Sequence, residues 1–212
     1  MSDLDRPHGR LPGHGHAHRG HGHAHGHPES VGASDPYRGA AEAAEPFGSG
    51  ARAAVITCSD RAAAGEYVDR AGPVLVETLR RWGFEAADAV IVPDGEAVGR
   101  AVSSSIEGGA AVVVTTGGTG VAPRDLTPQV TEPLLDVLLP GIPEAIRAVG
   151  VARGIPTSVL SRGVAGVAGG AVVVNLPGSV GAVRDGLDVL ATVLGHLLAE
   201  LARNDDPARG AE

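Results

Sequence analysis

Three aspartates are the side chains of this 212-residue chain best suited to chemistry. Asp60 and Asp94 each follow an apolar run, and Asp125 follows a glycine-rich loop. Carboxylates beside a phosphate site are the usual ligands of Mg²⁺, which prefers oxygen, keeps several waters and bridges phosphate oxygens. Transfer at a phosphate needs mainly positioning and charge neutralisation. The three carboxylates therefore indicate chemistry at a phosphate group, with Mg²⁺ as the metal.

A glycine-rich loop supplies a candidate anion site beside these carboxylates. Its residues are Thr116, Gly117, Gly118, Thr119 and Gly120. Glycines lack a Cβ where the backbone must bend or take positive φ, so main-chain N–H groups can converge on a phosphate or carboxylate. Thr127 and Pro128 then predict the N-cap and first residue of a helix, whose N-terminus would add partial positive charge.

Each of these features also has a purely structural interpretation, and spacing alone leaves both open. Asp94 follows Pro93 at a predicted helix start and would make a good N-cap. Asp125 could pair with a neighbouring arginine or brace its turn, and Asp60 could form an Asx turn. The glycine-rich loop could be a plain turn between a strand and a helix.

Strands that alternate with helices must position these residues. We expect strands at 53–58, 84–93, 111–116, within 158–167 and at 171–174, and helices at 73–82, 94–107, 127–139, 143–153 and 183–201. This alternation predicts a three-layer α/β fold, with a mostly parallel sheet and helices on both faces. Ligands of such sheets bind at the carboxyl ends of the strands, where Asp60, Asp94, the glycine-rich loop and the segment 175–179 would meet.

The composition excludes several classes of function. All 17 basic residues are arginine, so the lysine-bearing phosphate loop of ordinary ATP- and GTP-hydrolysing proteins is absent. Ser59-Asp60-Arg61 stands where a dinucleotide-binding fold needs its first glycines. A net charge of −8 without an arginine cluster argues against nucleic acid, and no apolar run is long enough to cross a membrane. We expect a cytoplasmic protein, which the single Cys58 is compatible with.

The first fifty residues are predicted to stay outside the folded domain. Eight of the nine histidines lie between His8 and His27, among glycine, alanine and arginine. Such a segment has almost nothing apolar to bury, although its imidazoles could bind Ni²⁺, Zn²⁺ or Cu²⁺. A solvated tail without a metal role is the alternative. We therefore expect a disordered His-rich arm and linker at 1–50, a folded domain at 51–204 and a frayed tail at 205–212.

Five motifs in order resemble the MogA/MoaB-type proteins of molybdenum cofactor biosynthesis, which are related to the G domains of gephyrin and of plant Cnx proteins. The resemblance spans about residues 53–201. Its motifs are Ser59-Asp60-Arg61 with Gly65 and Tyr67-Val68-Asp69, Pro93-Asp94, Thr115-Thr116-Gly117-Gly118-Thr119-Gly120 with Pro123-Arg124-Asp125-Leu126-Thr127-Pro128, Leu160-Ser161-Arg162, and Asn175-Leu176-Pro177-Gly178-Ser179.

The resemblance implies a molybdopterin-binding fold that usually forms a homotrimer. It also implies that Mg²⁺ and ATP adenylylate the terminal phosphate of molybdopterin, with release of pyrophosphate. Asp94 and Asp125 would be catalytic, most simply by holding Mg²⁺ and the triphosphate, and Thr116 to Gly120 would cradle a phosphate. The other residues that it assigns to substrate or nucleotide binding are Ser59, Asp60, Asp69, Arg124, Ser161, Arg162, Asn175, Pro177, Gly178 and Ser179.

Two positions depart from the family pattern. Gln129 stands where a carboxylate usually follows Thr-Pro, and Val180 stands where a proline usually follows Pro-Gly-Ser. The loss of a carboxylate near the site keeps open a carrier that binds the pterin without chemistry. A third alternative is metal delivery by the His-rich arm, but nickel chaperones with such tracts pair them with a lysine-bearing nucleotide loop that is absent here.

Overall fold

The computed structural model describes residues 35–204, so the expectations for residues 1–34 and for the tail at 205–212 lie outside it. The strands are β1 (Arg52–Cys58), β2 (Glu85–Ala86), β3 (Val90–Val92), β4 (Val112–Thr116), β5 (Val137–Leu138), β6 (Ala165–Ala168) and β7 (Ala171–Leu176). The helices are α1 (Ala40–Ala43), α2 (Asp60–Ala63), α3 (Ala71–Arg81), α4 (Glu96–Glu107), α5 (Thr127–Thr131), α6 (Gly141–Ala152) and α7 (Val180–Asn204). Two 3₁₀ turns, η1 (Glu132–Leu134) and η2 (Pro156–Leu160), join them.

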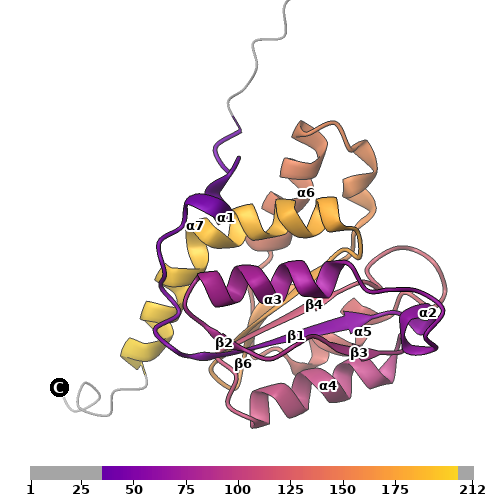
Figure 1. Ribbon diagram of the computed structural model, residues 1–212, viewed down its shortest axis with the longest axis horizontal. Helices are drawn as coiled ribbons and strands as arrows, with labels where there is room; N and C mark the ends of the chain where they lie inside the picture. The colour runs from indigo at the N-terminus through magenta and orange to yellow at the C-terminus, as the bar shows by residue number, and fades with distance from the viewer. Residues whose placement is uncertain (1–34, 205–212) are drawn as a thin grey trace, which may run out of the picture. The chain divides into compact units, whose positions relative to one another are not determined.

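The predicted three-layer α/β fold is confirmed. The strands form one sheet in the order β2-β1-β4-β7-β6-β5, with β3 also paired to β1. Pairing is parallel from β2 and β3 through β7, and antiparallel at β6 and β5. Figure 1 shows α3 and α7 on one face of the sheet and α4 on the other. None of the helices in residues 35–204 has the length and hydropathy to cross a membrane.

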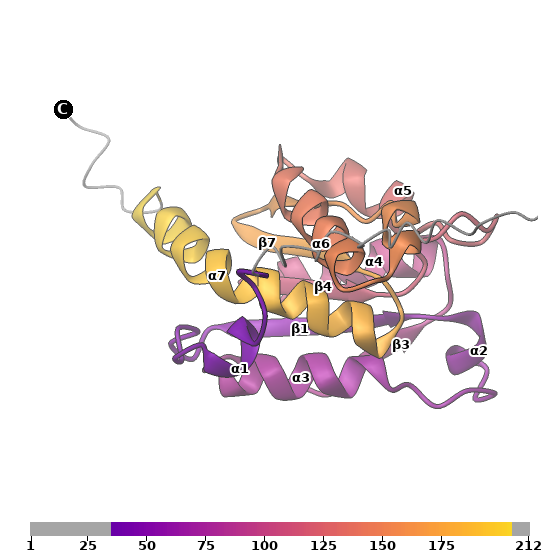
Figure 2. The ribbon, with the colours of Figure 1, turned by 90° about the horizontal axis from the view of Figure 1, so that it is seen from above.

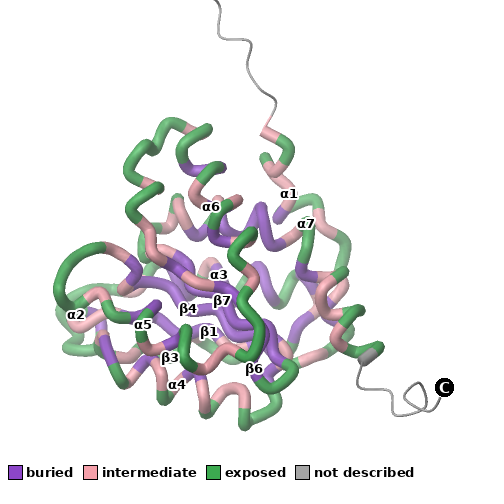
Figure 3. Tube along the Cα trace, turned by 180° about the vertical axis from the view of Figure 1, so that it is seen from behind, coloured by how far each residue is buried: buried purple, intermediate pink, exposed green. Residues whose placement is uncertain are grey.

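Alternate residues of the central strands belong to two hydrophobic cores, one on each face of the sheet. In β4, Val112 and Val114 pack with α3 and α7, whereas Val113 packs with α4. A strand covered on both faces reads as a continuous apolar run, which is how β4 and β7 stand out in the sequence. Figure 3 shows this buried centre behind the exposed loops.

Two predicted elements are shorter than expected. The strand predicted at 84–93 is split into β2 and β3, which pair with opposite ends of β1, at Arg52 and Ile56. The helix predicted at 127–139 ends after α5, because Pro133 has no N–H to donate and its ring would clash with the preceding turn. The chain continues as η1 and then pairs with β6 as the edge strand β5.

Residues 35–50, which the sequence assigned to the linker, instead pack on the domain, and we call them the N-terminal strap. Ala41 is buried; its N–H donates to Asp188 Oδ1 at 3.0 Å, and its carbonyl accepts from Trp82 Nε1 at 3.0 Å. Figure 2 shows α1 beside α7. A few contacts with distant residues hold the strap, and no periodic pattern in the sequence reveals them.

An arginine at the end of α6 ties the strap to α7. Arg153 donates to Asp35 Oδ2 at 2.7 Å and to Asp185 Oδ1 at 2.7 Å, and its Nη2 lies 2.9 Å from Asp188 Oδ2. Burial alone would lower the pKa of Arg153, but its interactions with these three carboxylates, which accept its hydrogen bonds, outweigh burial and raise the pKa above its ordinary value. The guanidinium therefore stays charged and fixes three segments of the chain together.

We expect Phe47→Ala to lower the free energy of unfolding by about 3 kcal/mol. The Phe47 ring lies 5.3 Å from the ring of Trp82 and 5.7 Å from that of Phe84, so its loss leaves a gap over the buried indole. Denaturant unfolding followed by the fluorescence of Trp82, the single tryptophan, measures the change. Glu45→Ala, at an exposed position of the strap, is the control and should change stability by less than about 0.5 kcal/mol. Equal stability of the two variants would contradict the role of the strap.

Candidate active site

The registers of the parallel strands bring the predicted site residues to one edge of the sheet. Thr57 pairs with Thr116, and Thr116 pairs with Leu176, so β1, β4 and β7 end side by side. β3 ends beside β1, where Val92 pairs with Cys58. The segments that follow these four strands carry Asp60, Asp94, the glycine-rich loop and residues 177–179, as the fold class predicted.

Asp60 and Asp94 hold each other through a reciprocal pair of hydrogen bonds. The Asp60 N–H donates to Asp94 Oδ2 at 3.3 Å, and the Asp94 N–H donates to Asp60 Oδ1 at 3.1 Å. Arg124 Nη1 donates to Asp60 Oδ2 at 2.8 Å. These bonds replace the structural roles considered for both residues, because Ser59 caps α2 and Gly95, with φ of 91°, stands at the N-cap of α4.

The carboxyl group of Asp94 lies in surroundings that disfavour its negative charge. Burial raises its pKa, and the negative charges of Asp60 and Asp125 raise it further, against the Asp60 N–H and Arg124, which lower it. Its Oδ1 is buried and accepts no hydrogen bond from any residue in 35–204. A buried carboxylate oxygen without a donor is costly, and a cation bound nearby would offset that cost.

The glycine-rich loop wraps directly against these carboxylates. Gly117 and Gly118 have φ of 101° and 62°. A Cβ on Gly118 would overlap Thr127 Oγ1 and would lie 2.7 Å from Asp94 Oδ1, and a Cβ on Gly120 would lie 2.6 Å from Asp125 Oδ2. The absence of side chains therefore lets the loop backbone approach both carboxylates.

Asp125 is half-buried and has two roles. Its Oδ2 accepts the Ala122 N–H at 2.8 Å, so it braces its own turn, as one interpretation of the sequence proposed. Arg162 donates to the carbonyl of Asp125, and its Nε donates to the carbonyl of Gly120 at 2.7 Å. The guanidinium of Arg162 thus fixes the backbone of the loop, and Asp125 lines a cavity beside the loop.

The glycine-rich loop contacts the 177–179 segment, where a Cβ on Gly178 would lie 3.3 Å from Gly117 Cα. A cavity opens on each side of this contact. The first cavity, of about 400 Å³, is bounded by the loop, α6, η2 and the start of α7. The second cavity, of about 360 Å³, is bounded by the ends of β1 and β4, the loop before α3 and the same 177–179 segment.

Most of the predicted binding residues line one of these two cavities. Those at the first cavity are Gly117, Gly118, Thr119, Gly120, Asp125, Ser161, Pro177, Gly178 and Ser179. Those at the second are Ser59, Asp69, Thr116, Gly117, Gly178 and Ser179. Asp60, Asp94 and Arg124 line neither, and lie beside the loop at the ends of β1 and β3.

Three predicted residues have structural partners that account for them. Asn175 is buried, and its amide donates to Thr115 Oγ1 at 3.0 Å and Thr131 Oγ1 at 3.2 Å. Asp69 Oδ1 accepts the two backbone N–H groups that open α3, at 2.9 and 3.0 Å, and Oδ2 accepts the Thr57 hydroxyl at 2.7 Å. Arg162 is the third, as the brace of the glycine-rich loop. These contacts position the loops that border the two cavities.

Thr127 differs from its prediction as a helix N-cap. Leu126 is the N-cap of α5, and Thr127 is its first residue, fully buried. Its hydroxyl has no hydrogen-bond partner within the part of the chain that the structure describes.

Burial also raises the pKa of the neighbouring Cys58 thiol to about 12, so this thiol stays protonated and is no nucleophile.

Several residues of the first cavity were not predicted from the sequence. Arg147 of α6, Ser158 of η2 and Asp185 of α7 line its side opposite the glycine-rich loop. They lie on the polar sides of their elements, and the periodicity of the sequence predicts that these sides are exposed to solvent. Only the packing of α6 against α7 turns that polar side toward a cavity.

A family model described as "Probable molybdopterin binding domain" matches residues 54–196. The chain belongs to this family. Among MogA/MoaB relatives, the molybdopterin adenylyltransferase of Pyrococcus furiosus is 39% identical over 148 residues, covering 68% of this chain and 87% of that protein. A bifunctional molybdenum cofactor biosynthesis protein of Synechococcus elongatus is 40% identical over 157 residues. The match covers 74% of this chain and 49% of that protein. The solved structure of the molybdopterin biosynthesis Mog protein of Mycobacterium ulcerans is 48% identical, with a TM-score of 0.69, and covers 71% of this chain and 99% of that one.

We expect Gly118→Ala to destabilise this MogA/MoaB domain well beyond the cost of a left-handed backbone alone. Gly65→Ala is a matched control, because Gly65 also has positive φ, at 75°, but a Cβ there would meet nothing within 4 Å. The control should cost about 1 kcal/mol, and Gly118→Ala at least about 2 kcal/mol. Urea unfolding measures both, and equal losses would show that the loop does not press on Asp94.

Proposed function

We propose that this protein transfers the adenylyl group of ATP to the terminal phosphate of molybdopterin and releases pyrophosphate. The observation that carries the proposal is the arrangement at the edge of the sheet. There a glycine-rich anion loop packs against Asp125 and against the buried oxygen of Asp94, which has no hydrogen-bond partner among residues 35–204. The names of relatives such as the Pyrococcus furiosus enzyme support the same activity.

The residues present fit the Mg²⁺ that the resemblance implies. Residues 35–204 contain no cluster of three or more His, Cys, Asp or Glu side chains that could enclose a metal. Mg²⁺ does not need one, since it is commonly bound by one or two carboxylates, with waters and substrate phosphates as its other ligands. Asp94 and Asp125 would hold the ion, and when bound it would neutralise the charge of the triphosphate.

The chain's own groups would orient the two substrates. The oxygen of the terminal phosphate of molybdopterin attacks the α-phosphorus of ATP, and the bond to the leaving pyrophosphate breaks. Backbone N–H groups at Gly117 to Gly120 would hold one phosphate, and the hydroxyls of Ser161 and Thr119, 3.3 Å apart, would contact it. Arg124, whose side chain is 79% exposed, can leave its ion pair with Asp60 at little cost and meet the triphosphate.

The departure at Gln129 does not favour the carrier alternative. The side chain of Gln129 is exposed on α5, and it lines neither of the two cavities. The missing carboxylate therefore removes no group from the site as it stands.

We also propose that the protein works in the cytoplasm as a homotrimer. A group of exposed apolar side chains on α6 and the segment after it supports the assembly, because an exposed apolar patch commonly marks a protein interface. They are Val151, Ile155, Val159 and Leu160. Light scattering of the purified protein measures the mass directly.

We expect Asp94→Asn and Asp125→Asn each to lower the rate of adenylyl transfer by at least about 100-fold, because each removes a charge that positions the phosphates. Binding of molybdopterin should be largely retained. The measurement is mass spectrometry of adenylylated pterin after incubation with ATP and Mg²⁺. Asp88→Asn, at a side chain that is 95% exposed, is the control and should turn over normally. Normal turnover of both site variants would overturn the mechanism.

Removal of residues 1–34 tests the His-rich arm without disturbing the fold. The cut leaves the N-terminal strap, which belongs to the compact unit that begins at Asp35. We expect adenylyl transfer to stay within about twofold of the full chain, because every site residue lies beyond the cut. Loss of activity in the shortened protein would instead favour metal delivery by the arm.

A further inference from the structure

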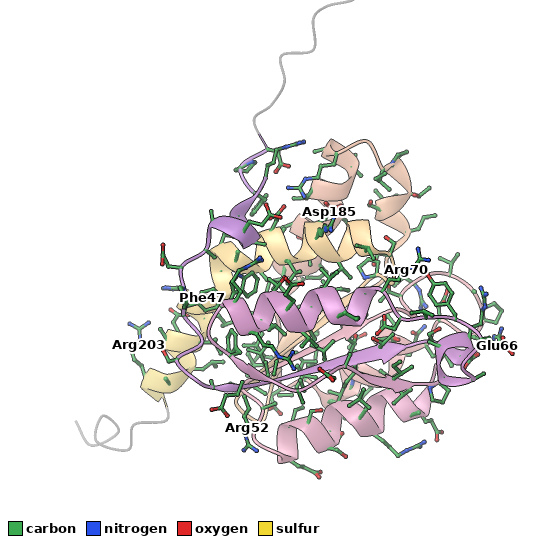
Figure 4. All side chains as sticks on the ribbon, viewed as in Figure 1. Phe47, Arg52, Glu66, Arg70, Asp185 and Arg203 are labelled. Atoms are coloured by element: carbon green, nitrogen blue, oxygen red, sulfur yellow. The ribbon has the colours of Figure 1, made fainter. Side chains whose placement is uncertain are left out.

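The side of the first cavity opposite the glycine-rich loop has a composition that phosphate binding does not explain. Ile146 of α6 and Ile155 and Leu160 at η2 give it apolar walls. Arg147 also lies on this side, where its Nη1 donates to the Ser161 carbonyl at 3.3 Å. Among the apolar walls lies a carboxylate, that of Asp185, on the second turn of α7. Figure 4 labels Asp185 on the side of α7 that faces α6. A carboxylate repels phosphate, so this part of the cavity suits another portion of a ligand.

The two oxygens of Asp185 have different surroundings. Oδ1 accepts from Arg153 Nη1 at 2.7 Å, which fixes the side chain. Oδ2 accepts no hydrogen bond from any residue between 35 and 204, although the side chain is only 15% exposed. Gly150 leaves room beside it, since a Cβ there would overlap Ser158 Oγ and would lie 3.7 Å from Asp185 Oδ2. A fixed acceptor with one free oxygen therefore borders an apolar cavity.

This combination matches a flat heterocycle that carries adjacent N–H donors. The 2-amino-4-oxopyrimidine ring of a pterin presents an amino group and a ring N–H on one edge, and a carboxylate accepts both with charge-assisted hydrogen bonds. Adenine presents an acceptor nitrogen beside its amino group and fits a carboxylate less well. A site that hydrogen-bonds a substrate N–H rejects an analogue without it, because the buried acceptor is left unpaired.

We propose that Asp185 is the specificity residue of the first cavity, where it binds the amino edge of the pterin and selects the pterin over adenine. This inference rests on the proposed function, in that molybdopterin is the substrate. The apolar side of the cavity then binds the pterin ring, and the glycine-rich loop binds the phosphate. Arg153 is then a positioning residue, because it holds Asp185 without lining the cavity.

Asp188 offers a matched control. It lies one turn further along α7, pairs with the same Arg153 at 2.9 Å, and is 11% exposed against 15% for Asp185. Its Oδ1 accepts the Ala41 N–H of the N-terminal strap, and it does not line the first cavity. Asp185→Asn and Asp188→Asn therefore remove the same charge from the same cluster, but only the first changes the cavity.

The experiment measures binding of molybdopterin and of ATP to the full chain by titration calorimetry. We expect Asp185→Asn to weaken molybdopterin binding by at least about tenfold, and to leave ATP binding within about twofold. Asp188→Asn should leave both affinities within about twofold. Equal weakening by the two variants, or weakening of ATP rather than of the pterin, would overturn the inference.

A second measurement does not depend on the fold of any variant. The wild-type chain should bind a 6-substituted pterin phosphate at least about tenfold more tightly than the analogue with a 2-oxo group in place of the 2-amino group. Asp185→Asn should reduce this preference, which a merely structural role would leave unchanged. Absence of the preference in the wild type refutes the role of Asp185. Preference without formation of adenylylated pterin would refute the proposed function and leave that role standing.

Discussion

The parallel, in-register pairing of β1, β4 and β7 is the constraint on which the rest of this structure depends. Because the three strands end together, the segments that follow them emerge at one edge, and residues as distant in sequence as Ser59 and Gly178 line the same cavity. Apolar packing on both faces fixes that register, since a shift of one residue would exchange the residues of the two cores. The site is thus positioned by the same valines that stabilise the fold.

The site itself is held in an arrangement that a folding requirement alone would not select. The negative charges of Asp60 and Asp125 disfavour the charged form of Asp94, and Asp94 and Thr127 bury oxygens that have no partner in the described chain. The reciprocal bonds between Asp60 and Asp94 and the bracing by Arg162 keep these groups in place. Such local cost is typical of functional sites, where a ligand supplies the missing interactions.

The sequence predicted the fold class, the order of most elements and the residues of the glycine-rich loop, because those depend on local periodicity and turn chemistry. Asp94 and Asp125 were candidates from their place after a strand and after the loop, and the family resemblance favoured a site role over a structural one. The roles of Asn175 and Asp69 as internal braces were not predicted, since their partners come from other strands and from a helix start. The split of the 84–93 strand, the N-terminal strap and the cavity face of α7 were missed for a related reason. Each depends on which distant element covers a segment, and a pattern read along the chain contains no such information.

The N-terminal strap has a consequence for the order in which the protein can fold. Ala41 and its partner Asp188 are 147 positions apart, and Asp35 bonds to Arg153 across 118 positions. The strap leaves the ribosome among the first segments of the domain, but the helices that bind it are synthesised last. Phe47 can pack on Trp82 and Phe84 as soon as these residues emerge. Asp35 and Ala41 must wait until Arg153 and α7 have emerged, so the docking of the strap is completed late.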